Sequence, residues 1–123
     1  MAYFDHSKKE NRYWIWSRFG GKCSYCGCDL NVNKFQVDHF DPLKRHDITY
    51  KSDFSKENCY PSCGQCNSSK SSFSIEQWRT ELELKVERLN KFYSIYRVCK
   101  SFGLVSENPD GRIVFYFERF ING

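Results

Sequence analysis

The pattern of apolar and polar positions predicts short elements in the first half of the chain. An apolar cluster at residues 13–19 ends at a glycine pair, residues 20–21, and predicts a short helix with a glycine stop. Residues 35–39 alternate apolar and polar side chains, which predicts a strand that leads into a polar loop at residues 40–56. Two compact cysteine-containing segments flank this strand and loop, residues 23–28 and residues 57–67.

The second half of the chain predicts a long helix followed by a strand. Apolar residues recur at helical spacing along one stripe: Ile75, Trp78, Leu82, Val86, Leu89, Tyr93 and Tyr96. Because no Gly or Pro interrupts residues 74–102, and Ser74 with Gln77 forms a capping box, we expect one continuous helix over that range. The chain then turns at residues 108–111, and the β-branched and aromatic residues of 112–117 predict a terminal strand. The element order indicates an α+β domain.

Composition limits the class of protein. At 123 residues the chain suffices for one compact domain, and its core must be built mainly from 11 Phe, 8 Tyr and 3 Trp. No apolar run approaches the 18 residues of a membrane span, so we expect no membrane association. The first residues lack the apolar stretch of an export signal, so we expect a cytoplasmic protein whose thiols stay reduced. The excess of 19 Lys and Arg over 15 Asp and Glu is mild, and it makes a polyanionic partner plausible.

Two cysteine pairs carry the strongest chemical signal. Cys23 and Cys26 are separated by two residues, as are Cys63 and Cys66. Each spacing lets both sulfurs reach one ion from a tight turn, and the two turns together complete a tetrahedral Zn²⁺ shell. Four thiolates leave no open position on the ion, so this zinc is expected to be structural. Zinc binding also supplies folding free energy to a domain with a small core.

The cysteines leave open which four residues bind zinc and whether the pairs bind zinc at all. Cys28 or Cys59 can substitute for one of the zinc ligands, whereas Cys99 is expected to be a small apolar residue of the long helix. The competing interpretation of the two pairs is a set of redox-active dithiols.

Four polar residues are not explained by a zinc site. Asp38 and His39 end the predicted strand, Asn58 leads into the second cysteine segment and Asn67 leaves it. Each residue alone has a structural interpretation, as a turn former, a satisfied histidine or a helix cap. Together they bring a carboxylate, an imidazole and two amides around one zinc-braced centre.

These motifs resemble a known family. The run CSYCG…QVDHFDP…ENCYPSCGQCNSSK is similar to the zinc-braced HNH endonucleases, and the resemblance covers about residues 10–80. It implies a ββα-metal core braced by a structural zinc on four cysteines, with an N-terminal helix, a long C-terminal helix and a terminal strand. The helix and strand also resemble those of small phage and prophage members of bacteria. We therefore expect one domain over residues 1–123, with residues 10–80 as the nuclease core and residues 74–123 as an extension.

The resemblance implies a role for each polar residue. Asp38 would bind one catalytic divalent ion, and His39 would be the general base that activates water. Asn58 would brace the loop and orient His39. Asn67 stands where the family name expects its last histidine, and it would be the second metal ligand. Because an amide oxygen suits hard ions, we expect Mg²⁺ or Mn²⁺ rather than Ni²⁺ or Zn²⁺ there.

The implied reaction is hydrolysis of a DNA phosphodiester that leaves 5′-phosphate and 3′-hydroxyl ends. Double-stranded DNA is the favoured substrate, and RNA stays open. Candidate contacts to the phosphate backbone are Lys44, Arg45, His46, Lys51 and Lys70. No base-reading helix stands out, so weak sequence specificity is expected. His6 is expected to be a surface residue without a role.

Other functions and the oligomeric state stay open. Non-catalytic alternatives are a zinc-finger-like module that binds nucleic acid and a zinc-stabilised protein-interaction domain. A monomer would nick DNA, and a homodimer would break both strands. Phe92 and Phe102 lie outside the main helical stripe and would support a dimer, but we favour packing against the strand predicted at residues 113–117.

Overall fold

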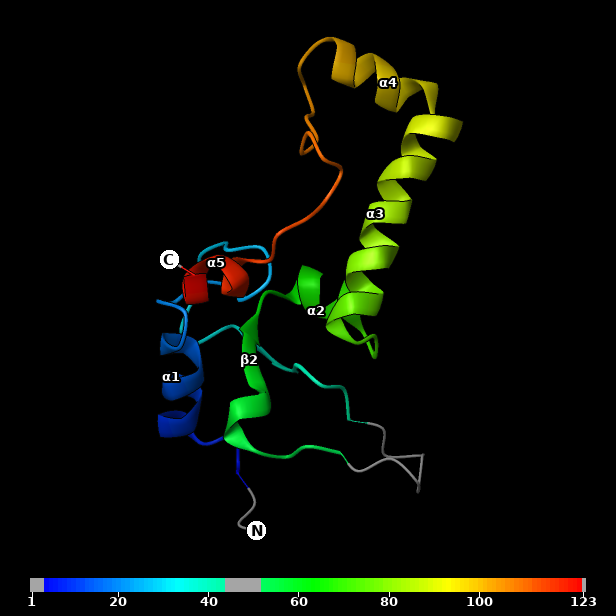
Figure 1. The fold of residues 1–123 in the computed structure, drawn as a ribbon. Coiled ribbons are helices and arrows are strands. Elements are labelled where there is room, and N and C mark those ends of the chain that lie inside the picture. Colours follow the sequence, from blue (N-terminus) through cyan, green and yellow to red (C-terminus); the bar gives the residue numbers. More distant parts are fainter. Residues whose placement is uncertain (1–3, 44–51, 123) are drawn as a thin grey trace. The chain divides into compact units, whose positions relative to one another are not determined.

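The computed structural model describes residues 4–43 and 52–122, and it divides into two compact units (Figure 1). The first unit comprises residues up to 75 together with residues from 114 onward, and the second comprises residues 76–113. The C-terminal residues, grouped with the extension in the sequence analysis, therefore belong to the first unit. Each unit is described by itself below.

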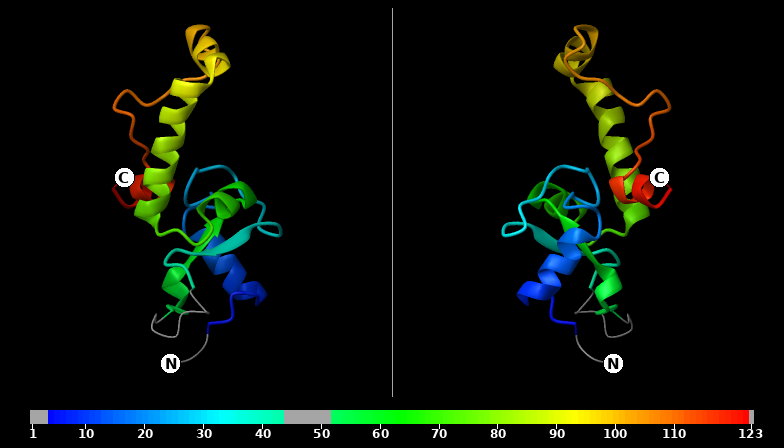
Figure 2. Two further views of the ribbon diagram at one scale, coloured as in Figure 1. Left: turned by 90° about the vertical axis from the view of Figure 1, so that its right-hand side faces the viewer. Right: turned by 90° about the vertical axis from the view of Figure 1, so that its left-hand side faces the viewer.

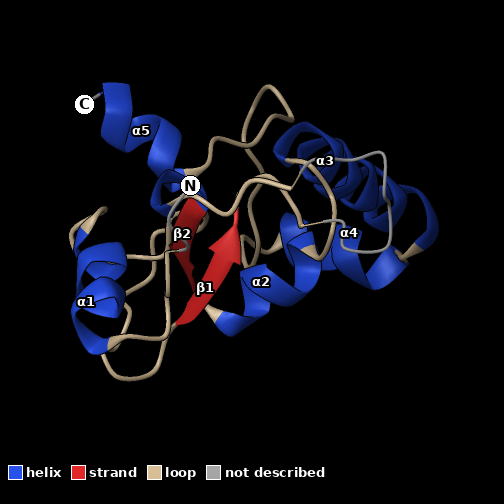
Figure 3. Cartoon of the chain, turned by 90° about the horizontal axis from the view of Figure 1, so that it is seen from below, coloured by secondary structure: helices blue, strands red, loops and turns tan. Residues whose placement is uncertain are grey.

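The first unit is built on a two-stranded antiparallel hairpin. Strand β1 (Gln36–His39) pairs with β2 (Cys59–Ser62), so that His39 lies opposite Cys59 and Gln36 opposite Ser62. Helix α1 (Lys9–Ser17) packs on β2, and α2 (Gly64–Lys70) contacts β1, so the strands lie between these two helices (Figure 3). A short 3₁₀ turn, η1 (Lys56–Asn58), precedes β2, and helix α5 (Tyr116–Asn122) completes the unit.

The predicted glycine stop of the first helix is confirmed. Gly20 and Gly21 both have positive φ angles, 67° and 79°. At Gly21 an added Cβ would lie 2.7 Å from the Trp16 ring, so only glycine fits this turn. The turn directs the chain from α1 into the first cysteine segment.

Aromatic rings form the core of the first unit, as the composition requires. Tyr60 on β2 stacks on Phe40, with ring centroids 4.6 Å apart, and the edge of Phe117 meets the Phe40 ring at 5.3 Å. Tyr25 lies parallel to Tyr60, and Phe115 stacks on Phe117. Rings offset or edge-on in this way add attraction beyond the area they bury.

The predicted terminal strand over residues 112–117 is wrong. Residues 112–115 are irregular, and α5 begins at Tyr116. Phe115 and Phe117 are buried, as their alternation predicts, but their backbone does not pair with β1 or β2. Instead, the amides of Tyr116 and Phe117 donate to the carbonyls of Tyr25 and Ser24 in the first cysteine segment, at 2.9 and 2.7 Å.

The second unit contains α4 (Ser94–Ser101) and nearly all of α3 (Ile75–Phe92). The single helix predicted over residues 74–102 is therefore wrong, although its predicted start is right. Tyr93 leaves helical geometry, with φ −123° and ψ 98°, and the chain changes direction there (Figures 1 and 2). The Arg97 guanidinium donates to the carbonyls of Asn90 and Lys91, at 2.6 and 3.4 Å, and so satisfies acceptors that the break releases.

The predicted core role of Phe92 and Phe102 is also wrong. Their side chains are 67% and 77% exposed, and residues 112–115 offer no strand for them to pack against. Among the described residues, no helix combines the length and apolar character needed to cross a membrane.

Candidate active site and metal centre

Thiols gather where the first cysteine segment meets the second. The sulfurs of Cys23, Cys26, Cys28 and Cys63 all lie within 4.8 Å of one another. Two of these sulfurs, those of Cys26 and Cys63, are 3.9 Å apart, and the Cys63 amide donates to the Cys23 sulfur at 3.4 Å. This all-sulfur donor set, drawn from two turns, has the chemistry of a closed zinc site.

The predicted fourth ligand, Cys66, lies beside this group rather than within it. Its amide donates to the Cys63 sulfur at 3.4 Å, and its thiol interacts with that of Cys23. Five thiols are thus clustered, with Cys28 as the addition. Cys59 points elsewhere and donates to the Ser55 carbonyl.

Gly27 allows Cys28 to join the cluster. It has a positive φ of 81°, and an added Cβ would lie 2.8 Å from the Tyr116 ring. A glycine is therefore required for both backbone and packing reasons, and it reverses the chain between Cys26 and Cys28.

The metal-free thiols differ in acidity. The hydrogen bond from Cys66 lowers the pKa of Cys23 to about 4, whereas the same bond raises the pKa of Cys66. Burial raises the pKa of Cys26, and it raises that of Cys28 to about 12. Zinc must therefore displace protons from most of the cluster, and its affinity falls as the pH falls.

Asp38 is buried at the centre of the hairpin, on β1. Its Oδ2 atom accepts a hydrogen bond from the Tyr25 hydroxyl and lies 3.2 Å from the Lys70 ammonium. Burial, and then the neighbouring carboxylate, raise the pKa of Tyr25, so its hydroxyl remains a donor at neutral pH. No described residue bonds the second carboxylate oxygen, Oδ1, which leaves that atom for another partner.

Asn67 lies on α2 near the same strand. Its amide nitrogen donates to the Gln36 side-chain oxygen at 2.9 Å, which orients the amide and leaves its oxygen as an acceptor. A carboxylate oxygen and an amide oxygen form a donor set for a hard divalent ion. The residues present therefore fit the catalytic ion that the family resemblance implies.

His39 is the last residue of β1 and is half-buried. Its ring meets that of His6 edge-on, with centroids 5.5 Å apart, so His6 has a contact that its isolated place in the sequence did not indicate. The Lys70 ammonium donates to the His39 carbonyl at 3.2 Å, which ties the strand end to α2.

Asn58 is buried and ties together the two chain segments on either side of residues 44–51. Its side-chain nitrogen donates to the carbonyls of Asp41 and Asp53, each at 2.9 Å, and its side-chain oxygen accepts from the Asp41 amide at 2.8 Å. These bonds fix the backbone at Asp41, just after β1, to the backbone at Asp53 and Asn58, just before β2.

The proposed phosphate contacts have a mixed outcome. Lys44, Arg45, His46 and Lys51 lie outside the described residues. The prediction that Lys70 contacts the phosphate backbone does not fit the structure, because its side chain is 0% exposed and pairs with Asp38. An ammonium in that position is not available on the surface to bind the DNA backbone. The sequence did not indicate that Lys70 is buried, because a basic residue in the last turn of a helix is ordinarily exposed.

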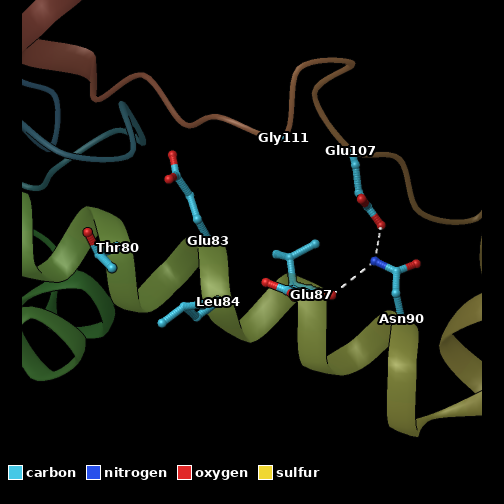
Figure 4. Close-up of a pocket in the computed structure, with 8 residues that line it drawn as sticks. Thr80, Glu83, Leu84, Glu87, Asn90, Glu107 and Gly111 are labelled. Carbon is cyan, nitrogen blue, oxygen red and sulfur yellow. Dashed lines mark hydrogen bonds between the residues drawn. The ribbon is translucent and has the colours of Figure 1, made fainter.

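A pocket of about 380 Å³ lies within the second unit, between α3 and the segment that follows α4 (Figure 4). Carboxylates of Glu83, Glu87 and Glu107 line it, so its charge does not suit a phosphate. Glu107 accepts from Asn90, Tyr96 and Lys100, which connects the ends of the unit.

Comparison with known proteins identifies the region that holds this site. The family model of the HNH endonuclease matches residues 23–73, which contain both cysteine pairs and all four polar site residues. Residues 23–73 therefore resemble an HNH endonuclease domain.

Two relatives agree with this identification. The SPbeta prophage-derived protein YoqL of Bacillus subtilis, named as a putative HNH endonuclease, is 34% identical in an alignment that covers 60% of this chain and 37% of that protein. A crystal structure of the Type II-C Cas9 enzyme from Actinomyces naeslundii is 25% identical and covers 66% of this chain and 9% of its own, with a TM-score of 0.53. The HNH domain thus has the α+β fold expected from the sequence.

Proposed function

We propose that this chain is a metal-dependent endonuclease that hydrolyses DNA phosphodiester bonds. The arrangement of β1 and α2 supports the proposal. Asp38 and His39 lie on β1, Asn67 lies on α2, which contacts β1, and all three fall within the residues that match the HNH family model. The chain spans about a third of the curated relative's length, so this activity rests on the site itself.

Each site residue has a chemical task. The oxygens of Asp38 and Asn67 would hold Mg²⁺ or Mn²⁺, and such an ion would supply positive charge against the negative charge that develops on the phosphate. The His39 imidazole accepts a proton from the attacking water, for which its ordinary pKa near 6.5 is suited. Asn58 fixes the chain beyond the strand end. Water attacks phosphorus, the bond between phosphorus and the 3′ oxygen breaks, and the leaving oxygen takes up a proton from solvent, which leaves 5′-phosphate and 3′-hydroxyl ends.

The zinc has a separate, structural task. Four thiolates would fill its shell, so it would brace the fold and take no part in the chemistry. Reduced, clustered thiols and a prophage-derived relative support a role inside a bacterial cell. One active site cuts one strand, so a monomer nicks duplex DNA.

Conversion of supercoiled plasmid to open circles in Mg²⁺ or Mn²⁺ tests the proposal. His39→Ala at equal zinc content should lower the nicking rate by about 10²- to 10⁴-fold, the usual contribution of a general base. His6→Ala is the matched control, because it removes the neighbouring ring and keeps the base, and it should retain most of the activity.

Other outcomes favour other functions. If neither wild type nor His39→Ala cuts DNA while both bind it, the protein is a nucleic-acid-binding module. If both cut equally, His39 is not the base. Faster cleavage of a matched RNA than of duplex DNA would change the substrate class.

A further inference from the structure

Lys70 is a fully buried cation at the proposed metal site. Its ammonium lies 3.2 Å from Asp38 Oδ2 and 3.2 Å from the His39 carbonyl oxygen, and the side chain is 0% exposed. A buried ammonium is costly unless it is paired and hydrogen-bonded, and these two contacts supply both conditions.

The contact with Lys70 changes the charge that a divalent ion meets. Asp38 carries one negative charge, Asn67 is neutral, and Lys70 returns one positive charge to the same carboxylate. Two donors, Lys70 and the Tyr25 hydroxyl, share Oδ2, so the carboxylate is held with Oδ1 as its remaining ligand atom. Lys70 thus positions the ligand oxygen and cancels the charge that would attract the ion.

We propose that Lys70 makes binding of the catalytic ion depend on DNA, an inference that rests on the proposed function. Without DNA the three site residues have no net charge, and one carboxylate oxygen with one amide oxygen holds Mg²⁺ or Mn²⁺ weakly. A DNA phosphate supplies the missing negative charge and further oxygen ligands. The ion is then held only where a phosphodiester is in place, and Lys70 is a positioning residue rather than a group that touches the substrate.

Binding of Mn²⁺ to the zinc-loaded full chain, measured by electron paramagnetic resonance, tests this without reference to cleavage. Lys70→Met removes the charge at similar length. It should raise the Mn²⁺ affinity of the DNA-free protein roughly tenfold or more, since a unit charge a few ångströms from a divalent ion has that effect even in water. Lys34→Met, at an exposed position of the same unit, should leave the affinity unchanged.

Further variants separate charge from folding. Addition of Asp38→Asn to Lys70→Met should abolish the gain in Mn²⁺ affinity. That result would show that the ion binds at the Asp38 carboxylate. If Lys70→Met loses zinc, Lys70→Gln replaces it, because its amide can still donate to the His39 carbonyl. A purely structural role for Lys70 predicts unchanged or weaker Mn²⁺ binding in both variants, and that result would overturn the proposal.

The DNA dependence itself is measured on protein with an intact Lys70. In the His39→Ala background, a short duplex should raise Mn²⁺ affinity at least roughly tenfold, and should raise it much less once Lys70→Met is added. An equal affinity with and without duplex would overturn the proposal, even if every Lys70 variant failed to fold. If wild type cuts no DNA while these binding differences hold, the proposed function fails and the role of Lys70 stands.

Discussion

The two units of the chain differ in how far packing between aromatic rings holds them together. In the first unit Tyr25, Phe115 and Phe117 are 2%, 4% and 9% exposed, whereas in the second Phe92 and Phe102 are largely exposed. The first unit is held by ring packing and a thiol cluster that join distant segments. The second is held by helical hydrogen bonds and polar side chains. The comparison teaches that one short chain contains both a core of packed rings beside a thiol cluster and a unit whose buried ring, among its described residues, is Trp78.

Helix α4 illustrates the second arrangement. Its polar residues Arg97 and Lys100 reach Asn90 and Glu107 within the unit, while Ile95, Val98 and Phe102 are exposed. A surface helix of a soluble protein ordinarily shows the reverse pattern. The stability of α4 therefore depends on polar contacts within the unit rather than on burial of its apolar side chains.

Removal of zinc should produce the largest difference in stability between the two units. A chelator is expected to unfold the first unit, because structural zinc contributes on the order of 10 kcal/mol to folding. The helical hydrogen bonds of α3 do not depend on the metal and should persist in part. Hydrogen exchange followed on peptides from each unit measures the difference. Equal loss of protection in both units would show that they fold as one.

Single cysteine variants sharpen the same comparison. Zinc content by native mass spectrometry should fall in Cys23→Ser and Cys63→Ser and stay at one ion in Cys99→Ser, whose position is in α4. Between Cys28→Ser and Cys66→Ser, the variant with the lower zinc affinity identifies the fourth ligand. We expect each to retain zinc and the double variant to lose it, because five thiols are clustered.

Truncation of one phenylalanine in each unit should give a smaller but clear contrast. Phe117→Ala removes a ring packed against Phe40 and Tyr60 and should lower the free energy of unfolding by about 3–5 kcal/mol. Phe102→Ala should change it by no more than about 0.5 kcal/mol, because that ring is exposed. Denaturant melts of zinc-loaded protein supply both values. Similar losses would mean that Phe102 is covered in solution, as in the homodimer considered above.

Acid should weaken the second unit by the smallest amount. Hydrogen bonds from Lys100, Asn90 and Tyr96 lower the pKa of Glu107 to about 2. A carboxyl whose pKa is lowered by folding stabilises the unit at pH values above its ordinary pKa. That contribution is lost as the pH falls toward 2. The protection factors of the α4 amides, corrected for the pH dependence of intrinsic exchange, should therefore fall between about pH 4.5 and 2. Glu107→Gln should remove the pH dependence, and its persistence would assign the effect to another group.

Features carried by local spacing could be predicted from the sequence. The cysteine pairs predicted the clustering of thiols, and the Asp-His and Asn residues that the sequence singled out lie in the region that the HNH family model matches. The apolar alternation near residue 115 predicted burial correctly but the wrong secondary structure, because the pattern does not reveal which backbone Tyr116 and Phe117 will bond.

Features that depend on contacts through space could not be predicted. The helix break at Tyr93 has no Gly or Pro to mark it, and it is stabilised by Arg97 from the following helix. The burial of Lys70 requires the hairpin that positions Asp38, and the place of Cys28 requires the turn at Gly27. In each case the deciding partner lies outside the local pattern that the prediction used.

The bonds from Tyr116 and Phe117 to the first cysteine segment also set the order in which the protein is completed during synthesis. The ribosome releases Ser24 and Tyr25 early, but their partners emerge only after the whole second unit has been translated. Contacts of such long sequence separation close late in folding. The aromatic core around Tyr60 therefore stays open on the nascent chain, and the site on β1 and α2 acquires its full support only when that closing segment leaves the ribosome.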